Sequence, residues 1–106
     1  KGFGAFHGPV QRVVLRFAKS VAHLAQERRF HHTQRNDERA DGTIDVTMEL
    51  AGLPELAAWV AGYGGEVLPI SPPHFRDLVR ERFAKGLERL DQATPPSPAR
   101  AATGDS

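Results

Sequence analysis

Cysteine is missing from this 106-residue chain, and several kinds of chemistry are excluded with it. Without a thiol the chain can form no disulfide, thiolate nucleophile, CxxC redox pair or cysteine-type zinc site. Net charge is also small, because fourteen Lys and Arg residues stand against thirteen Asp and Glu residues and leave a formal charge of +1. Since so small a charge supplies no overall field that could hold a polyanion, direct nucleic-acid binding by this chain is not favoured.

Long apolar runs are missing too. No run approaches the roughly 20 residues of a membrane-spanning helix, and residues 1–8 do not lead into the apolar core of a signal peptide. We therefore expect a cytoplasmic protein with no membrane partner. The chain begins at Lys1 in a glycine-containing stretch, and we interpret residues 1–10 as a connector from an upstream domain.

What is present is ordinary for a globular domain. Hydrophobic residues make up 40% and charged residues 25% of the chain, and a chain of this length can bury a core without disulfides or metals. We assign the ordered domain to residues 11–91. After Gln92 the composition shifts to Pro, Ala, Ser, Thr and Gly, so residues 92–106 are predicted to be a disordered and dispensable tail.

Four segments have strand patterns. Residues 11–17 and 43–50 alternate apolar and polar side chains, which is typical of half-buried strands. Residues 33–39 are too polar for a central strand and suit a charged edge strand, and the Asp41-Gly42 turn that follows predicts a hairpin. Residues 67–70 form a short fourth strand.

Three segments have helical spacing, and they alternate with the strands. Residues 19–29 and 53–63 are amphipathic, and the final helix runs from the Pro72-Pro73 pair to Asp91. Its apolar side chains fall at steps of three and four: Phe75, Leu78, Val79, Phe83, Leu87 and Leu90. The order βαββαβ followed by a helix predicts an α+β fold, a ferredoxin-like antiparallel sheet with two helices on one face and an additional C-terminal helix.

A series of spaced motifs resembles one known family. They are Val13-Val14-Leu15-Arg16-Phe17, AQERRFHHTQ at 25–34, Asp41-Gly42-Thr43, LPELAAWV at 53–60, Gly62-Tyr63-Gly64, Val67-Leu68-Pro69-Ile70 and the stretch 72–82. Over roughly residues 10–91 the chain is similar to the WCX domain, the C-terminal extension that follows the WYL domain in bacterial helix-turn-helix transcriptional regulators. It departs from some members, which have Trp at the position of Phe30 and Pro-Ser at the positions of His32 and Thr33.

The resemblance implies a function within a longer protein. Such regulators have an N-terminal winged helix that binds DNA, a middle WYL domain that senses a ligand, often a nucleic acid or nucleotide, and this C-terminal part, which contributes to dimerisation and control. The resemblance therefore implies a regulatory and dimerisation domain that forms a homodimer. It would couple effector state to WYL and winged-helix domains outside this chain, and would reach DNA only through the winged helix. The alternative from another class is a stand-alone ferredoxin-like module that binds a small-molecule effector.

Catalytic and metal-binding patterns are not found in the sequence. His31 and His32 are adjacent and would point to opposite sides of an extended chain, and the other three histidines share no ligand spacing. No GxSxG or similar nucleophile signature occurs. We predict no enzymatic activity, no catalytic residue, no metal and no cofactor.

Base stacking on the sheet, as in RRM domains, is also disfavoured. The wet face of the 43–50 strand offers Thr43, Asp45, Thr47 and Glu49, which include carboxylates and no aromatic ring. Arg12 and Arg16 on the neighbouring strand could pair with the two acids across the sheet.

Two sets of residues are candidates for contacts. Guanidinium, imidazole and amide groups suit phosphate or carboxylate recognition, although a solvated helix end explains the same composition; these residues are Arg28, Arg29, His32, Gln34 and Arg35. The final helix is longer than one small sheet needs for cover, so its outer apolar residues should reach a second subunit. The dimer-interface candidates on this helix are Phe83, Leu87 and Leu90. Trp59 lies about 100° off the apolar stripe of the 53–63 helix and is either a boundary core residue or a fourth interface candidate.

Overall fold

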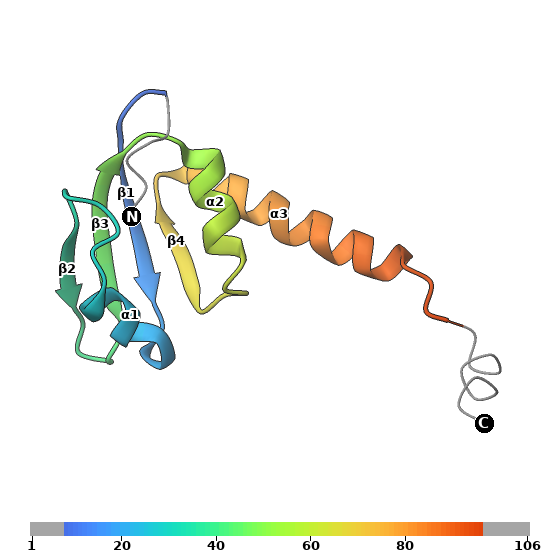
Figure 1. Cartoon of the computed structure of the whole chain (residues 1–106), viewed down its shortest axis with the longest axis horizontal. Coiled ribbons are helices and arrows are strands. Elements are labelled where there is room, and N and C mark those ends of the chain that lie inside the picture. Colours follow the sequence, from blue (N-terminus) through green and yellow to red (C-terminus); the bar gives the residue numbers. More distant parts are fainter. Residues whose placement is uncertain (1–7, 97–106) are drawn as a thin grey trace.

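The computed structural model describes residues 8–96 and shows an α+β fold. Its elements are β1 (Gln11–Phe17), a 3-10 turn η1 (Lys19–Val21), α1 (Ala22–Glu27), β2 (Arg35–Glu38), β3 (Ile44–Leu50), α2 (Leu53–Ala61), β4 (Val67–Ser71) and α3 (Pro73–Gln92). The strands form one antiparallel sheet in the order β2-β3-β1-β4, with α1 and α2 on the same face (Figure 1). The predicted ferredoxin-like arrangement with an additional C-terminal helix is confirmed. Residues 1–7 and 97–106, in the predicted connector and tail, lie outside the described residues.

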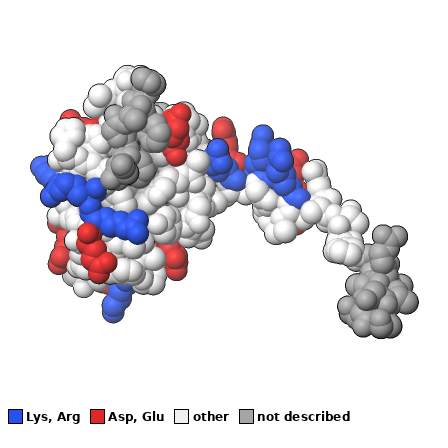
Figure 2. Space-filling view, in the orientation of Figure 1, with Lys and Arg blue, Asp and Glu red and all other residues white. Residues whose placement is uncertain are grey.

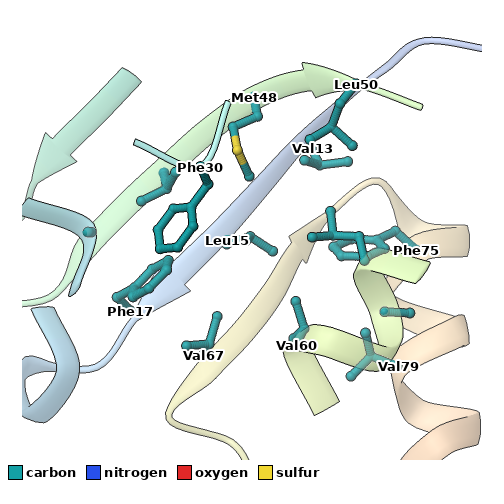
Figure 3. Close-up of a cluster of buried hydrophobic side chains, with 14 of the residues drawn as sticks. Val13, Leu15, Phe17, Phe30, Met48, Leu50, Val60, Val67, Phe75 and Val79 are labelled. Atoms are coloured by element: carbon teal, nitrogen blue, oxygen red, sulfur yellow. The ribbon is translucent and has the colours of Figure 1, made fainter. Parts of the chain in front are cut away.

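The core forms on the face of the sheet that alternation predicts. In β1 and β3 every second side chain is buried, and the register places Leu15 opposite Val46 and Val13 opposite Met48. Directly opposed residues of an antiparallel pair share a face, so these side chains form one apolar layer. Helices α2 and α3 add Leu56, Val60, Phe75 and Val79 to the same cluster (Figure 3).

The other face of the sheet is tied by ion pairs. Arg16 Nε and Nη2 donate to the two oxygens of the Asp45 carboxylate, at 2.7 and 2.9 Å, and Arg12 contacts Glu49 at 3.2 Å. These are the two cross-strand pairs predicted from the sequence. The bidentate hydrogen bonds to Arg16 lower the pKa of Asp45, so this carboxyl is ionised at neutral pH.

The segment after β1 differs from the predicted helix over 19–29. The helix stops at Glu27, and Arg28 already has extended backbone angles. The physical reason lies in the next residues, because Phe30 is buried and its ring stacks on Phe17 at a centroid distance of 6.0 Å. Burying Phe30 requires the chain to turn back toward the sheet, and tertiary packing therefore overrides the helical pattern. Strand β2 is likewise shorter than the predicted 33–39.

Helix α3 begins against the core and then leaves it. Its first turns bury Phe75 and Val79 beside β4 and α2, while the rest of the helix extends away from the body of the domain (Figure 1). Pro72 is the N-cap of the helix, and Pro73 is its first residue. At 1.5 Å per residue the helix is about 30 Å long, close to the longest dimension of a small domain.

Candidate interaction site

The outer part of α3, residues 80–92, is exposed along its whole length, and we call it the α3 arm. Three large apolar side chains lie on it: Phe83 is 38% exposed, Leu87 60% and Leu90 70%. Uncharged surface runs beside charged side chains along this projecting part in Figure 2. Exposure of three such residues on one short segment is what an interaction surface requires.

The three apolar residues of the α3 arm share one side of the helix. Their spacing is four and then three residues, which is the repeat that forms the seam between paired helices. Gly86 lies beside the seam, and a Cβ added there would meet nothing within 4 Å in this chain. The three residues that the sequence analysis named on this helix, Phe83, Leu87 and Leu90, therefore form a continuous exposed stripe.

The stripe runs into a groove between β4 and α3, which we call the β4–α3 groove. It encloses about 220 Å³. Its lining consists of Leu68, Pro69 and Ile70 from β4 and Arg76, Val79, Arg80 and Phe83 from α3. Leu68 is 43% exposed, so the groove has an apolar wall open to solvent. Sequence reasoning missed this groove, because no local pattern shows that β4 lies beside the middle of α3.

A second groove lies on the opposite side of α3, facing α2. It encloses about 490 Å³, with Pro54, Ala57 and Leu78 as its apolar lining. Its rim carries the cationic side chains of Arg82, Lys85 and Arg89 together with Glu81. The side of α3 that faces β4 is therefore mainly apolar, and the side that faces α2 is basic.

Trp59 lies within an aromatic cluster of the domain itself. Its ring is half-buried, with centroids 5.2 Å from Phe30, 4.9 Å from Tyr63 and 6.4 Å from Phe17. The structure thus packs this dimer-interface candidate against the core, whereas the other three candidates are exposed on the α3 arm.

Gln34 has a buried role inside the loop between α1 and β2. Its amide nitrogen lies within hydrogen-bond distance of three acceptors: Ala25 O at 3.4 Å, Arg28 O at 3.2 Å and Asn36 Oδ1 at 3.0 Å. Its amide oxygen accepts the backbone N–H of Phe30 at 2.6 Å. Since an amide has two N–H groups, one hydrogen is shared, and the side chain is fully used in ending α1 and shaping the loop.

The other predicted contact residues divide between two places. Arg28, Arg29 and His32 are exposed on the loop after α1. Figure 2 shows several basic side chains on the left of the body of the domain. Arg35 is exposed in β2 and pairs with Thr47, so it lies on the ion-paired face of the sheet. Gln34, although buried, contacts this loop: its amide nitrogen lies 3.2 Å from Arg28 O, and its backbone carbonyl accepts Arg29 Nη1 at 3.4 Å. The structure thus places Arg28, Arg29, His32 and Gln34 on one loop and sets Arg35 apart on the sheet.

His31 belongs to the same loop. Its Nδ1 accepts the backbone N–H of Thr33 at 3.2 Å and lies 2.7 Å from Thr33 Oγ1. Burial, and secondly the neighbouring His32 ring stacked on it at 4.4 Å, lower the pKa of His31. Thr33 in turn accepts the backbone N–H of Glu49 at 2.9 Å, which ties the loop to the end of β3.

Metal and membrane sites were searched for within residues 8–96. That part of the chain holds no group of three His, Asp or Glu side chains placed to bind a metal ion. None of its helices combines the length and apolar character needed to cross a membrane.

Comparison with known proteins gives one result. The sequence profile of the WCX domain matches residues 9–87, which is most of the chain and extends from β1 to the middle of the α3 arm. No curated protein matches the chain.

Proposed function

This chain belongs to the WCX family, the C-terminal domains of WYL-type regulators, and from this premise we propose that it dimerises a bacterial transcription regulator. In this proposal a homodimer of WCX domains holds two copies of the WYL and winged-helix domains together. A conformational change caused by effector binding elsewhere in the regulator is transmitted to the winged helices through the dimer. The domain itself has no enzymatic role and works in the cytoplasm.

The observation that carries the proposal is the exposed stripe of the α3 arm. A solvent-facing helix half usually has polar side chains all round, whereas this one presents Phe83, Leu87 and Leu90 on one side. A second copy with the same stripe would cover it, and symmetric pairs are the commonest oligomers. Dimerisation also explains why α3 continues for three turns beyond the last residue it buries, Val79.

A second candidate function is supported by the groove between α2 and α3. Its volume of about 490 Å³ falls within the range of small-molecule sites, and Arg82, Lys85 and Arg89 would favour an anionic effector. In this alternative the domain binds an effector as an independent module and works as a monomer.

Light scattering coupled to size-exclusion chromatography separates the two functions. We expect the unmodified chain to have the mass of a dimer and Leu87→Asp to have half that mass, because an unpaired charge in an apolar contact costs several kcal/mol. The matched control is Lys85→Asp, which adds the same side chain two residues earlier, about 160° away around the helix. It should remain dimeric.

Circular dichroism of both variants must match that of the unmodified chain, since position 87 is exposed in the single chain. A strictly monomeric unmodified chain whose melting temperature rises with one anionic metabolite would contradict the proposal and favour the effector module.

A further inference from the structure

The order of side chains along α3 defines how two arms can pair. Phe83, Leu87 and Leu90 occupy successive seam positions, and the preceding seam position is Arg80. Arg80 also lines the β4–α3 groove. The inner end of the seam is therefore an apolar pocket with a cation at its side, and the outer end is an exposed leucine followed by Asp91.

These two ends are complementary in shape. Leu90, 70% exposed, is a branched apolar side chain with little contact in its own chain. The β4–α3 groove, about 220 Å³ and lined by Leu68, Ile70 and Val79, has room for such a side chain. A helix cannot fold back to place its own outer end in this groove, so Leu90 can enter such a groove only in a second copy.

The two ends are also complementary in charge. Asp91 is eleven residues from Arg80, which is close to three full turns, so both lie on the same flank of the stripe. In an antiparallel pair of helices, residues on the same flank face each other. Aligning Phe83 with Leu87 of the second copy brings Leu90 opposite Arg80 and Asp91 beside it, and symmetry repeats both contacts.

We propose that two copies of this chain pair their α3 arms antiparallel, with Leu90 of each copy seated in the β4–α3 groove of the other and Asp91 paired with Arg80. The proposal rests on the proposed dimerisation and specifies its interface. Parallel pairing would instead set Arg80 against Arg80 of the second copy, would put the two Asp91 side chains on opposite flanks of the pair, and would leave both grooves empty.

Charge reversal tests the register. We expect Arg80→Asp or Asp91→Arg to raise the dimer dissociation constant about tenfold, because symmetry repeats the lost pair and each copy gains a repulsion. The double variant Arg80→Asp/Asp91→Arg should return to within about threefold of the unmodified chain, since the swapped pair is again complementary. Arg82→Asp, with the same change in net charge on the basic side of α3, is the matched control and should have the smaller effect.

Cysteine crosslinking gives an independent readout, because the chain has no cysteine of its own. Mixing Leu68→Cys chains with Leu90→Cys chains should give a crosslinked heterodimer with a short bis-maleimide. Leu90→Cys alone should not crosslink, because the antiparallel register separates the two positions by about ten residues, or 15 Å.

The outcomes distinguish the interface from dimerisation itself. If the chain is a dimer but Leu90→Cys crosslinks to itself, or the charge swap fails to restore affinity, this interface is wrong while the proposed function stands. If no dimer forms at any concentration, both are wrong.

Discussion

At the scale of single residues, the amide of Gln34 shows how a polar side chain can hold a loop. It lies nine-tenths buried and joins the end of α1, the Phe30 backbone and β2. The last carbonyls of a helix have no partner within the helix, and Gln34 supplies one for Ala25 and Arg28. Sequence analysis counted Gln34 as a contact residue because it lies in a polar cluster suited to phosphate or carboxylate recognition, and no local pattern indicates that this glutamine is buried.

We predict that Gln34→Ala destabilises the domain. The substitution removes the amide oxygen that accepts the Phe30 N–H and the amide nitrogen that donates to Arg28 O, while Ala25 O keeps Asn36 Nδ2 at 2.8 Å. Losing these buried hydrogen bonds costs about 1–3 kcal/mol. The free energy of unfolding from urea titration measures the loss. The neighbouring exposed residue gives the control, since Arg35→Ala should change stability by less than about 0.5 kcal/mol. Equal stability of both variants would show that the hydrogen bonds of Gln34 are replaced by water.

At the scale of elements, the two parts of α3 respond differently to substitution. The first turns contribute to the core, whereas the α3 arm contacts solvent on every side in the single chain. A change in the arm should therefore alter local helix order and association without altering the core.

Gly86→Ala tests this division. Alanine favours an exposed helix interior over glycine by about 1 kcal/mol, and the added Cβ meets no atom within 4 Å. We expect slower amide hydrogen exchange in residues 80–92 and a dimer dissociation constant no higher than that of the unmodified chain. Weaker association would mean that the paired helices approach each other closely at Gly86. The contact between the helices would then be centred on Gly86 and not on the line of Phe83, Leu87 and Leu90.

Local patterns predicted the strands and α3 well, and tertiary contacts account for what they missed. Alternation in β1 and β3 and the three-four spacing in α3 are properties of the chain itself, so they can be read before folding. The early end of α1 depends on Phe30 reaching Phe17 across the sheet. The β4–α3 groove depends on Leu68 of β4 and Phe83 of α3 lining the same space, and neither arrangement has a local signal.

At the scale of the whole molecule, stability and association are linked. Any partner that binds only the folded state stabilises it in proportion to the logarithm of its concentration. If the second copy is that partner, the melting temperature should depend on protein concentration.

We predict a rise of about 2–5 °C in melting temperature for each tenfold increase in protein concentration above the dissociation constant. Differential scanning fluorimetry over three decades of concentration measures it through Trp59. Leu87→Asp should show no such dependence. A dependence that persists in this variant would place the interface away from the α3 arm.

The two edges of the sheet bear on a different hazard, uncontrolled fibre growth. Edge strands invite further strands to add without end, and both edges here are blunted. Strand β2 is only Arg35–Glu38, polar and exposed throughout, while β4 carries Pro69, which has no N–H to donate, and has α3 beside it. If two copies pair their α3 arms as proposed, the blunted edges disfavour open-ended addition of strands and leave a helix contact that closes after two chains.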